Sequence, residues 1–121
     1  MTVTTRIKPP TRRKNRTQKV KLEGQTFYAC FGEYENGTLA EVFLDASKQG
    51  TFVRGIMDAL ARVLSVSLQC GTPVAELVGA LRTLNFPPQG FVQGSSVGEA
   101  SSVVDWLAQE IEATYPTPER V

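Results

Sequence analysis

The stretch that decides the fold of this chain is Gly32-Glu-Tyr-Glu-Asn-Gly-Thr-Leu-Ala-Glu-Val-Phe-Leu-Asp45. At its centre, Asn36-Gly37 is a strong tight-turn signal, because both residues tolerate the positive φ that hairpin turns require. The segment that leads into this turn, Gln25 to Tyr34, is rich in aromatic and β-favouring residues, and polar and apolar residues alternate after the turn from Thr38 to Asp45. The stretch therefore predicts two antiparallel strands joined by a hairpin.

A second hairpin precedes this one. Lys19-Val-Lys-Leu alternates polar and apolar residues, and Glu23-Gly24 supplies a turn. Together the two hairpins predict an N-terminal meander of about three strands. On the third strand, we expect helices to cover one face and the other face, which carries Leu39 and Phe43, to be a partner surface.

Helical periodicity begins after Ser47-Lys-Gln-Gly50. Apolar residues then recur at three- and four-residue spacing as far as Leu68, and Gly71 fits the position just beyond the helix end. We expect this helix to be central to the core. Its predicted stripe consists of Phe52, Ile56, Leu60, Val63, Leu64 and Leu68, widened by Val53, Met57 and Val66.

Two further helices are expected towards the C-terminus. Thr72-Pro73 fits an N-cap followed by proline at the first helical position, which predicts a helix from Pro73 to about Leu84. Ser96-Val-Gly-Glu99 matches a capping box that would begin a third helix, and Pro116 would end it. The segment from 85 to 94, with two prolines and two glycines, is predicted to be an ordered loop anchored by Phe86 and Phe91.

Strands first and helices after predict an α+β fold: a three-stranded antiparallel meander followed by two or three helices packed on one face. We divide the chain into a basic arm over 1–15, expected to be disordered, a single α+β domain over 16–115, and a C-terminal tail over 116–121. A length of 121 residues suits one domain with one core.

Charge is unevenly distributed along the chain. Residues 1–21 hold eight basic residues and no acidic one, whereas residues 22–121 hold the other five bases and all 12 acids. The formal net charge of +1 therefore conceals a basic arm on an acidic body. We consider two roles for the arm: it binds phosphate groups, or it is a solvated linker that lies against the acidic body.

Composition argues against several function classes. The chain has no histidine, so it lacks the commonest general base near neutral pH and every Ser-His or Cys-His arrangement. Cys30 and Cys70 are 40 positions apart, which suggests two reduced core thiols, with a redox pair or a disulfide as the lesser alternative, and no metal site. We expect no metal and no cofactor. No apolar run is long enough for a membrane span and no signal peptide is recognisable, so we expect a cytoplasmic protein.

The order of these motifs resembles the TSCPD accessory domain of vitamin B12-dependent (class II) ribonucleotide reductases, here as a small stand-alone protein. The resemblance covers roughly residues 16–115. The segments that carry it are Arg16-Thr-Gln-Lys19, Gly32-Glu-Tyr-Glu-Asn-Gly37, Ala40-Glu-Val-Phe-Leu-Asp45, Ser47-Lys-Gln-Gly50, Ser67-Leu-Gln-Cys-Gly-Thr-Pro-Val74 and Phe86-Pro-Pro-Gln-Gly-Phe-Val-Gln-Gly94.

The resemblance implies that the chain is related to these reductases but does not catalyse their reaction. The family's chemistry needs a thiyl-forming cysteine, a reducible cysteine pair and a cobalamin site, and neither Cys30 nor Cys70 can be assigned to those roles. The Thr-Ser-Cys-Pro-Asp motif is also absent. We therefore expect a non-catalytic protein and not an enzyme.

Three functions follow as hypotheses. The first is an accessory or interaction domain whose partner is a ribonucleotide reductase catalytic subunit, with a nucleotide as a further ligand. The second is an independent homo-oligomer that sequesters a nucleotide or cyclic nucleotide, as small phage counter-defence proteins do. The third is nucleic-acid binding through the basic arm, which we rank last because the body is acidic.

Candidate ligand-binding residues combine forked cationic donors with aromatic rings and an amide. Arginine suits phosphates, and an aromatic ring can stack on a base. For each residue the alternative is structural, namely surface solvation for the arginines and loop anchoring for the phenylalanines. The candidates are Arg12, Arg13, Arg16, Arg82, Phe86, Phe91 and Gln93.

Overall fold

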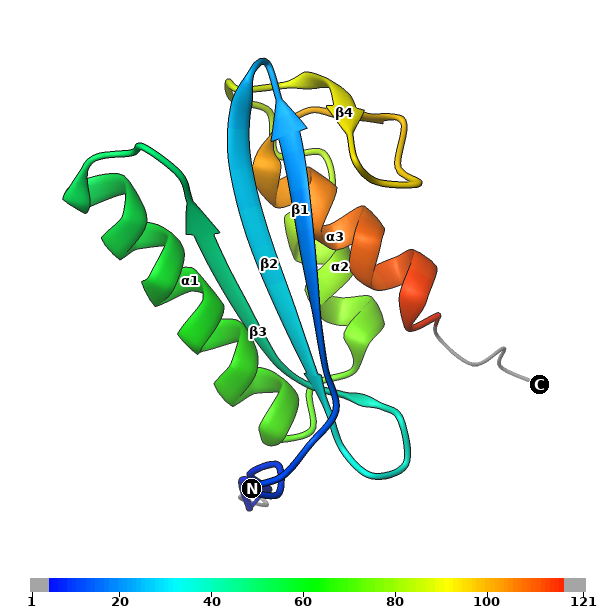
Figure 1. The fold of residues 1–121 in the computed structure, drawn as a ribbon. Helices are drawn as coiled ribbons and strands as arrows, with labels where there is room; N and C mark the ends of the chain where they lie inside the picture. The colour runs from blue at the N-terminus through cyan, green and yellow to red at the C-terminus, as the bar shows by residue number, and fades with distance from the viewer. Residues whose placement is uncertain (1–4, 117–121) are drawn as a thin grey trace. The chain divides into compact units, whose positions relative to one another are not determined.

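The computed structural model describes residues 5–116. Its elements are β1 (Asn15–Leu22), β2 (Gln25–Glu33), β3 (Leu39–Ala46), α1 (Thr51–Gln69), α2 (Val74–Leu81), β4 (Gly90–Gln93), β5 (Glu99–Ala100) and α3 (Val103–Thr114) (Figure 1). The strands form one five-stranded antiparallel sheet in the order β3-β2-β1-β4-β5. The α+β class and the N-terminal meander of three strands are confirmed, and two short strands are added to them.

Two compact units make up the described residues, and the β1–β2 hairpin contributes to both. The first unit contains residues 5–18 and 28–72, and the second contains 19–27 and 73–116. Both predicted hairpin turns are present. Gly37 has φ +85°, and Glu23 and Gly24 have φ +50° and +76°, the positive values that tight hairpin turns use.

In the first unit, α1 runs alongside β3, the last strand on its side of the sheet (Figure 1). The Ser65 hydroxyl accepts a hydrogen bond from Val42 N at 2.9 Å and donates one to Val42 O at 3.0 Å. The Gln69 side-chain amide donates to Ala40 O at 3.0 Å. Side chains of α1 thus pair with backbone groups that an edge strand would leave without strand partners.

The predicted core stripe of α1 is partly wrong. The buried side of the helix is formed by Met57, Ala61, Leu64 and Leu68, whereas Leu60 is half-buried. Five predicted core residues are exposed instead: Phe52, Val53, Ile56, Val63 and Val66. The apolar arc of α1 is wider than the side that meets the sheet, and periodicity alone cannot tell which part of such an arc is covered.

The predicted partner face of β3 also needs correction. Leu39 is buried, and so is Glu41, which shares its side of the strand. Phe43 is 49% exposed, and Tyr28 on β2 is 38% exposed. The open part of this face is therefore aromatic and centred on Phe43, without Leu39.

In the second unit, α2 packs against α3. The α2 helix is shorter than predicted, because Arg82 is extended with ψ 142° and Thr83 has φ +68°. Its N-cap is Pro73 and not Thr72.

The predicted loop over 85–94 contains a strand. β4 pairs with β1, with Leu22 opposite Val92, and with β5, with Phe91 opposite Glu99. Phe86 and Phe91 are 41% and 75% exposed, so their predicted role as buried anchors is wrong. The buried residue of the strand is Val92.

The third helix begins later than predicted. Ser102 is its N-cap, and the Ser102 hydroxyl accepts from Asp105 N at 2.9 Å. The Ser96–Glu99 capping box is wrong, because Glu99 lies in β5. On α3, Trp106 is completely buried and donates from its indole N–H to Ser95 Oγ at 3.1 Å. The helix ends at Thr114, before Pro116 as predicted.

Within residues 5–116, no helix is both long and apolar enough to cross a bilayer.

Candidate functional site

A buried carboxylate on β3 organises the first unit. Glu41 is only 6% exposed, and its side chain lies over Gly32 of the neighbouring strand. A Cβ at position 32 would come within 2.5 Å of Glu41 Oε1 and 2.6 Å of Glu41 Cγ. Glycine at position 32 therefore makes room for the buried glutamate. The contact between Gly32 and Glu41 explains why both residue types occur in the Gly32–Asp45 stretch.

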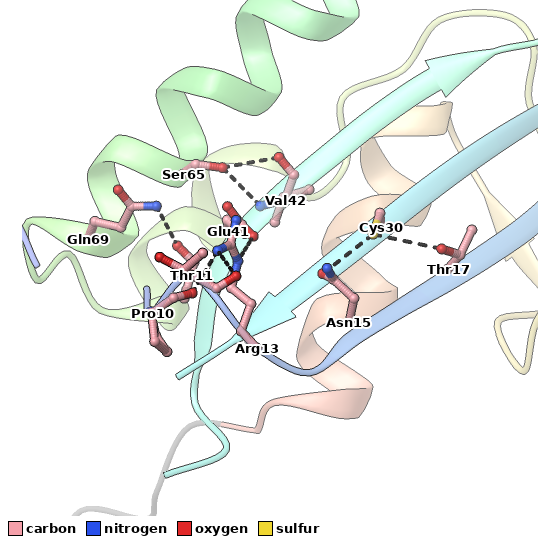
Figure 2. Close-up of polar contacts among 11 residues, drawn as sticks. Pro10, Thr11, Arg13, Asn15, Thr17, Cys30, Glu41, Val42, Ser65 and Gln69 are labelled. Carbon is pink, nitrogen blue, oxygen red and sulfur yellow. Dashed lines mark hydrogen bonds and ion pairs between the residues drawn. The ribbon is translucent and has the colours of Figure 1, made fainter. Parts of the chain in front are cut away.

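Arg13, from the basic arm, pairs with this carboxylate. Its Nε donates to Glu41 Oε1, and its terminal nitrogen donates to Pro10 O at 2.7 Å (Figure 2). The Arg13 side chain is 25% exposed and the Glu41 side chain 8%. One guanidinium thus neutralises a buried charge and holds the turn of the arm at Pro10.

More of the arm is joined to the C-terminal end of α1. Ile7 N donates to Gln69 O at 2.8 Å, and Arg6 Nε donates to the Gln69 side-chain oxygen at 2.7 Å. The Tyr34 hydroxyl donates to Ile7 O at 2.5 Å. Burial raises the pKa of Tyr34 above its ordinary value of 10.0, and interaction with Cys70 adds to this, so the hydroxyl keeps its proton at neutral pH. Disorder of the arm in the free protein stays a prediction.

Two cavities adjoin the arm. One, of about 330 Å³, is lined by Arg12, Arg13 and Lys14 together with the β2–β3 turn from Glu33 to Gly37. The other, of about 670 Å³, is lined by the arm, Tyr34 and the end of α1 from Leu68 to Gly71. The smaller cavity brings two of the predicted arginines together. Arg16 lies elsewhere, with its guanidinium 4.6 Å from the centre of the Phe31 ring.

A third hollow, of about 540 Å³, opens on the aromatic part of the sheet beside the start of α1. We call it the aromatic groove. Its lining includes Thr17, Tyr28, Cys30, Phe43, Asp45 and Arg54. Thr17 donates to the Cys30 sulfur at 3.7 Å, and that thiol donates to the Asn15 side-chain oxygen at 3.6 Å (Figure 2).

An ion pair forms one wall of the aromatic groove. Arg54 donates to the two carboxylate oxygens of Asp45 at 2.8 and 2.9 Å. These hydrogen bonds, followed by one from Ala46 N, hold the pKa of Asp45 below its ordinary value of 3.8. The wall therefore carries both charges at neutral pH, next to two exposed aromatic rings.

The remaining predicted residues lie in the second unit. Arg82 donates to Asp105 at 2.9 Å, and Phe86 N donates to Ser101 O at 3.0 Å. Phe91 and Gln93 are exposed on β4. The seven predicted site residues therefore fall into two groups, Arg12, Arg13 and Arg16 in the first unit and the other four in the second.

Asp105 is a polar centre that the sequence interpretation missed. It is 3% exposed, and its two oxygens accept four hydrogen bonds, from Arg82, Thr83, Ser101 and Gln109. The signal that could have found it is Ser102-x-x-Asp105, a second capping pattern just after that of Ser96–Glu99. Among residues 5–116, no three cysteine or acidic side chains gather closely enough to hold a metal ion.

Comparison with known proteins gives one consistent result. The model of the TSCPD domain matches residues 2–115. The chain is similar to a vitamin B12-dependent ribonucleotide reductase of Bradyrhizobium diazoefficiens, with 39% identity over 111 residues, 91% of this chain and 9% of that protein. The same enzyme of Agrobacterium fabrum is 36% identical, again over 91% of this chain and 9% of the relative. That of Rhodopirellula baltica is 32% identical over 88% of this chain and 10% of the relative.

The chain thus spans about a tenth of the length of the curated relatives it matches. No solved structure matches it.

Proposed function

Since this chain belongs to the TSCPD domain family, we propose that it is a non-catalytic accessory domain that acts by binding the catalytic chain of a vitamin B12-dependent ribonucleotide reductase. The observation that carries the proposal is the similarity of 91% of the chain to one short segment of such reductases. In those relatives, the segment is covalently joined to the rest of a much longer enzyme. A separate copy would have to make its contacts across an interface.

The aromatic groove is the surface that we assign to this interface. Tyr28 and Phe43 expose two rings on neighbouring strands, and exposed aromatic residues are the side chains most enriched at protein interfaces. The Asp45–Arg54 pair beside them supplies both charges for polar contacts at the rim. By contrast, Glu41 and Asp105 are engaged within the fold, which supports a contact role and not a chemical one.

Co-purification tests this proposal. We expect the tagged chain to retain a B12-dependent reductase from an extract of the cell that encodes both, and Phe43→Ala to reduce the retained amount at least tenfold. Phe91→Ala removes a ring that is more exposed but lies outside the aromatic groove, and it should retain the reductase as the wild type does. Absence of the reductase from the wild-type sample, with both proteins present in the extract, would refute the proposal.

We infer a second candidate function, nucleotide binding, from the cavity of about 330 Å³ beside the arm. Arg12 and Lys14 are exposed on either side of Arg13 and line this cavity with it, so three cationic residues lie at one hollow, whose lining also includes Glu33 and Glu35. Its volume lies at the lower end of small-molecule sites. The same chemistry would serve a mononucleotide or a cyclic nucleotide, whether it is sequestered by this chain alone or sensed for a reductase.

Calorimetry against mono-, di- and cyclic nucleotides tests this second function. We expect binding that weakens as salt is raised and that falls at least tenfold in Arg12→Ala/Lys14→Ala. Lys48→Ala, on the loop before α1, is the matched control for loss of an exposed cation. If no nucleotide in the panel releases heat, the hypothesis fails without affecting the reductase proposal.

A further inference from the structure

The two cavities beside the arm adjoin each other. The residues that line both of them are Pro10, Tyr34, Glu35 and Asn36. From these shared residues, the cavity of about 330 Å³ continues to Arg12 and Lys14, and the cavity of about 670 Å³ continues to the end of α1. All of this lining belongs to the first unit. A ligand that occupied both cavities would therefore meet three different surroundings in a fixed order.

The smaller cavity supplies the cationic end of this order. Arg12 and Lys14 are exposed, whereas Arg13 between them is already paired within the fold (Figure 2). Glu33 and Glu35 also line this cavity, so its cations lie beside carboxylates. Carboxylates repel each phosphate group that a ligand adds, which disfavours a polyphosphate or a nucleic-acid strand. The charges of this cavity therefore suit one phosphate group better than several.

The residues shared by the two cavities supply both a hydrogen-bond donor and an acceptor. Asn36 Oδ1 accepts from Thr38 N at 3.1 Å and from Thr38 Oγ1 at 2.7 Å, so the turn uses the oxygen of this amide. Within residues 5–116, its N–H groups have no partner. Glu35, the preceding residue, is exposed and adds an acceptor carboxylate. Ribose hydroxyls both donate and accept, and carboxylates bind them in dinucleotide-binding folds.

The larger cavity supplies an apolar and aromatic end. Ile7, Pro10 and Leu68 line it together with Tyr34, and Lys8 adds a donor. The Tyr34 hydroxyl donates to Ile7 O at 2.5 Å, which holds the ring and the arm in the wall of this cavity. Apolar side chains around an aromatic ring suit the flat face of a nucleobase. The volume lies within the range of about 300–1,000 Å³ for small-molecule sites.

We propose that the two cavities together bind a ribonucleoside 5′-monophosphate, with its phosphate group in the smaller cavity and its base in the larger one. Arg12 and Lys14 bind the phosphate group in this arrangement. Glu35 and Asn36 bind the ribose hydroxyls between the cavities, and Tyr34 contacts the base. The assignment rests on the nucleotide-binding function proposed above, and it adds the class of nucleotide and the position of each of its parts.

Calorimetry with parts of the ligand tests the position of the base. The probes are the ribonucleoside 5′-monophosphates of the common RNA bases and ribose 5-phosphate, which has no base. We expect the tightest monophosphate to bind at least tenfold more tightly than ribose 5-phosphate. In Ile7→Ser, which keeps the backbone contacts of residue 7, this ratio should fall at least threefold. Equal binding of ribose 5-phosphate and every monophosphate would overturn this proposal and leave phosphate binding by the arm intact. No heat from any nucleotide would instead refute the nucleotide-binding function itself.

Asn36→Asp tests the position of the ribose. The new carboxylate still accepts from Thr38 but has no N–H groups, and Asp-Gly also forms tight hairpin turns. We expect this variant to bind the monophosphates at least tenfold more weakly. Asn85→Asp makes the same replacement at an exposed position of the second unit and should bind as the wild type does. The 2′,3′-dideoxy form of the tightest monophosphate should bind the wild type at least fivefold more weakly. Unchanged affinity in both measurements would exclude the ribose from this position.

Discussion

Replacing Asp105 with alanine is expected to lower the free energy of unfolding by about 3–5 kcal/mol, because four donors lose a buried charged acceptor and a hydrogen bond to a charged group contributes about 1.5–3 kcal/mol. The carboxylate accepts from Arg82 Nε at 2.9 Å and Thr83 N at 2.8 Å on one oxygen. On the other oxygen it accepts from Ser101 N at 3.0 Å and the Gln109 side chain at 2.9 Å. Alanine would remove the acceptor for all four donors. Urea denaturation of both proteins measures the difference.

Two variants separate the hydrogen bonds from loss of side-chain volume. Asp105→Asn keeps the shape and one acceptor oxygen, but its amide nitrogen would face the N–H of Ser101 or Thr83, so we expect most of the loss to persist. Gln109→Ala removes one donor and leaves the carboxylate, and we expect a loss of about 1 kcal/mol. If Asp105→Asn is as stable as the wild type, the charge of Asp105 contributes nothing to the free energy of unfolding.

The same site predicts how stability responds to acid. Burial alone would raise the pKa of Asp105, but hydrogen bonds from Thr83 N, Ser101 N, Gln109 and Arg82 outweigh it and hold the pKa below the ordinary value of 3.8. Because the folded pKa is lower than the unfolded one, the stabilisation is fully present above the unfolded value. It is lost as the pH falls through the folded pKa. The stability difference between the wild type and Asp105→Asn should therefore shrink below about pH 4.

Removal of Arg13 is expected to have the second largest effect. We expect it to lower the free energy of unfolding by about 3 kcal/mol, the lower end of the range for breaking a buried ion pair. Arg13→Ala leaves the Glu41 carboxylate, whose side chain is 8% exposed, without its cation. It also removes the hydrogen bond to Pro10 O that holds the arm. We expect trypsin to cleave after Arg6 and Arg12 faster in this variant. Lys14→Ala, at the exposed neighbouring position, is the control.

A double-mutant cycle isolates the charge at this site. In Glu41→Gln, the buried group is neutral and of nearly the same shape, so the further change Arg13→Ala strands no carboxylate. In the Glu41→Gln background, we expect Arg13→Ala to lower the free energy of unfolding by only about 1 kcal/mol, the value of an ordinary hydrogen bond. An equal cost of Arg13→Ala in both backgrounds would show that Arg13 acts by packing and not by neutralising Glu41.

Local signals in the sequence sufficed for the first three strands. Asn36-Gly37 and Glu23-Gly24 each fix a turn within a few residues, and the alternation on either side of them fixes the strands. β4 and β5 could not be predicted in this way. They have four and two residues, and they exist because Val92 and its neighbours pair with β1, which is about 70 residues earlier in the chain.

The candidate site was predictable only in part. Arg12 and Arg13 were recognised from charge, and Phe43 from strand alternation. The pairing of Arg13 with Glu41 depends on how the arm folds back over β3, which no periodic pattern encodes. Similarly, Ser96–Glu99 and Ser102–Asp105 are equally good capping patterns in sequence. Pairing of Glu99 with β4 removes the first of them and leaves Ser102 to begin α3.

The bonds between Ser65 and the backbone of Val42 also bear on how far association of this chain can proceed. A bare edge strand is a template on which strands of other molecules add without limit, and that is the route to fibres. At one end of the sheet order, α1 occupies backbone groups of β3, and at the other end, β5 offers only two residues. Growth by strand addition is therefore suppressed at both ends of the sheet.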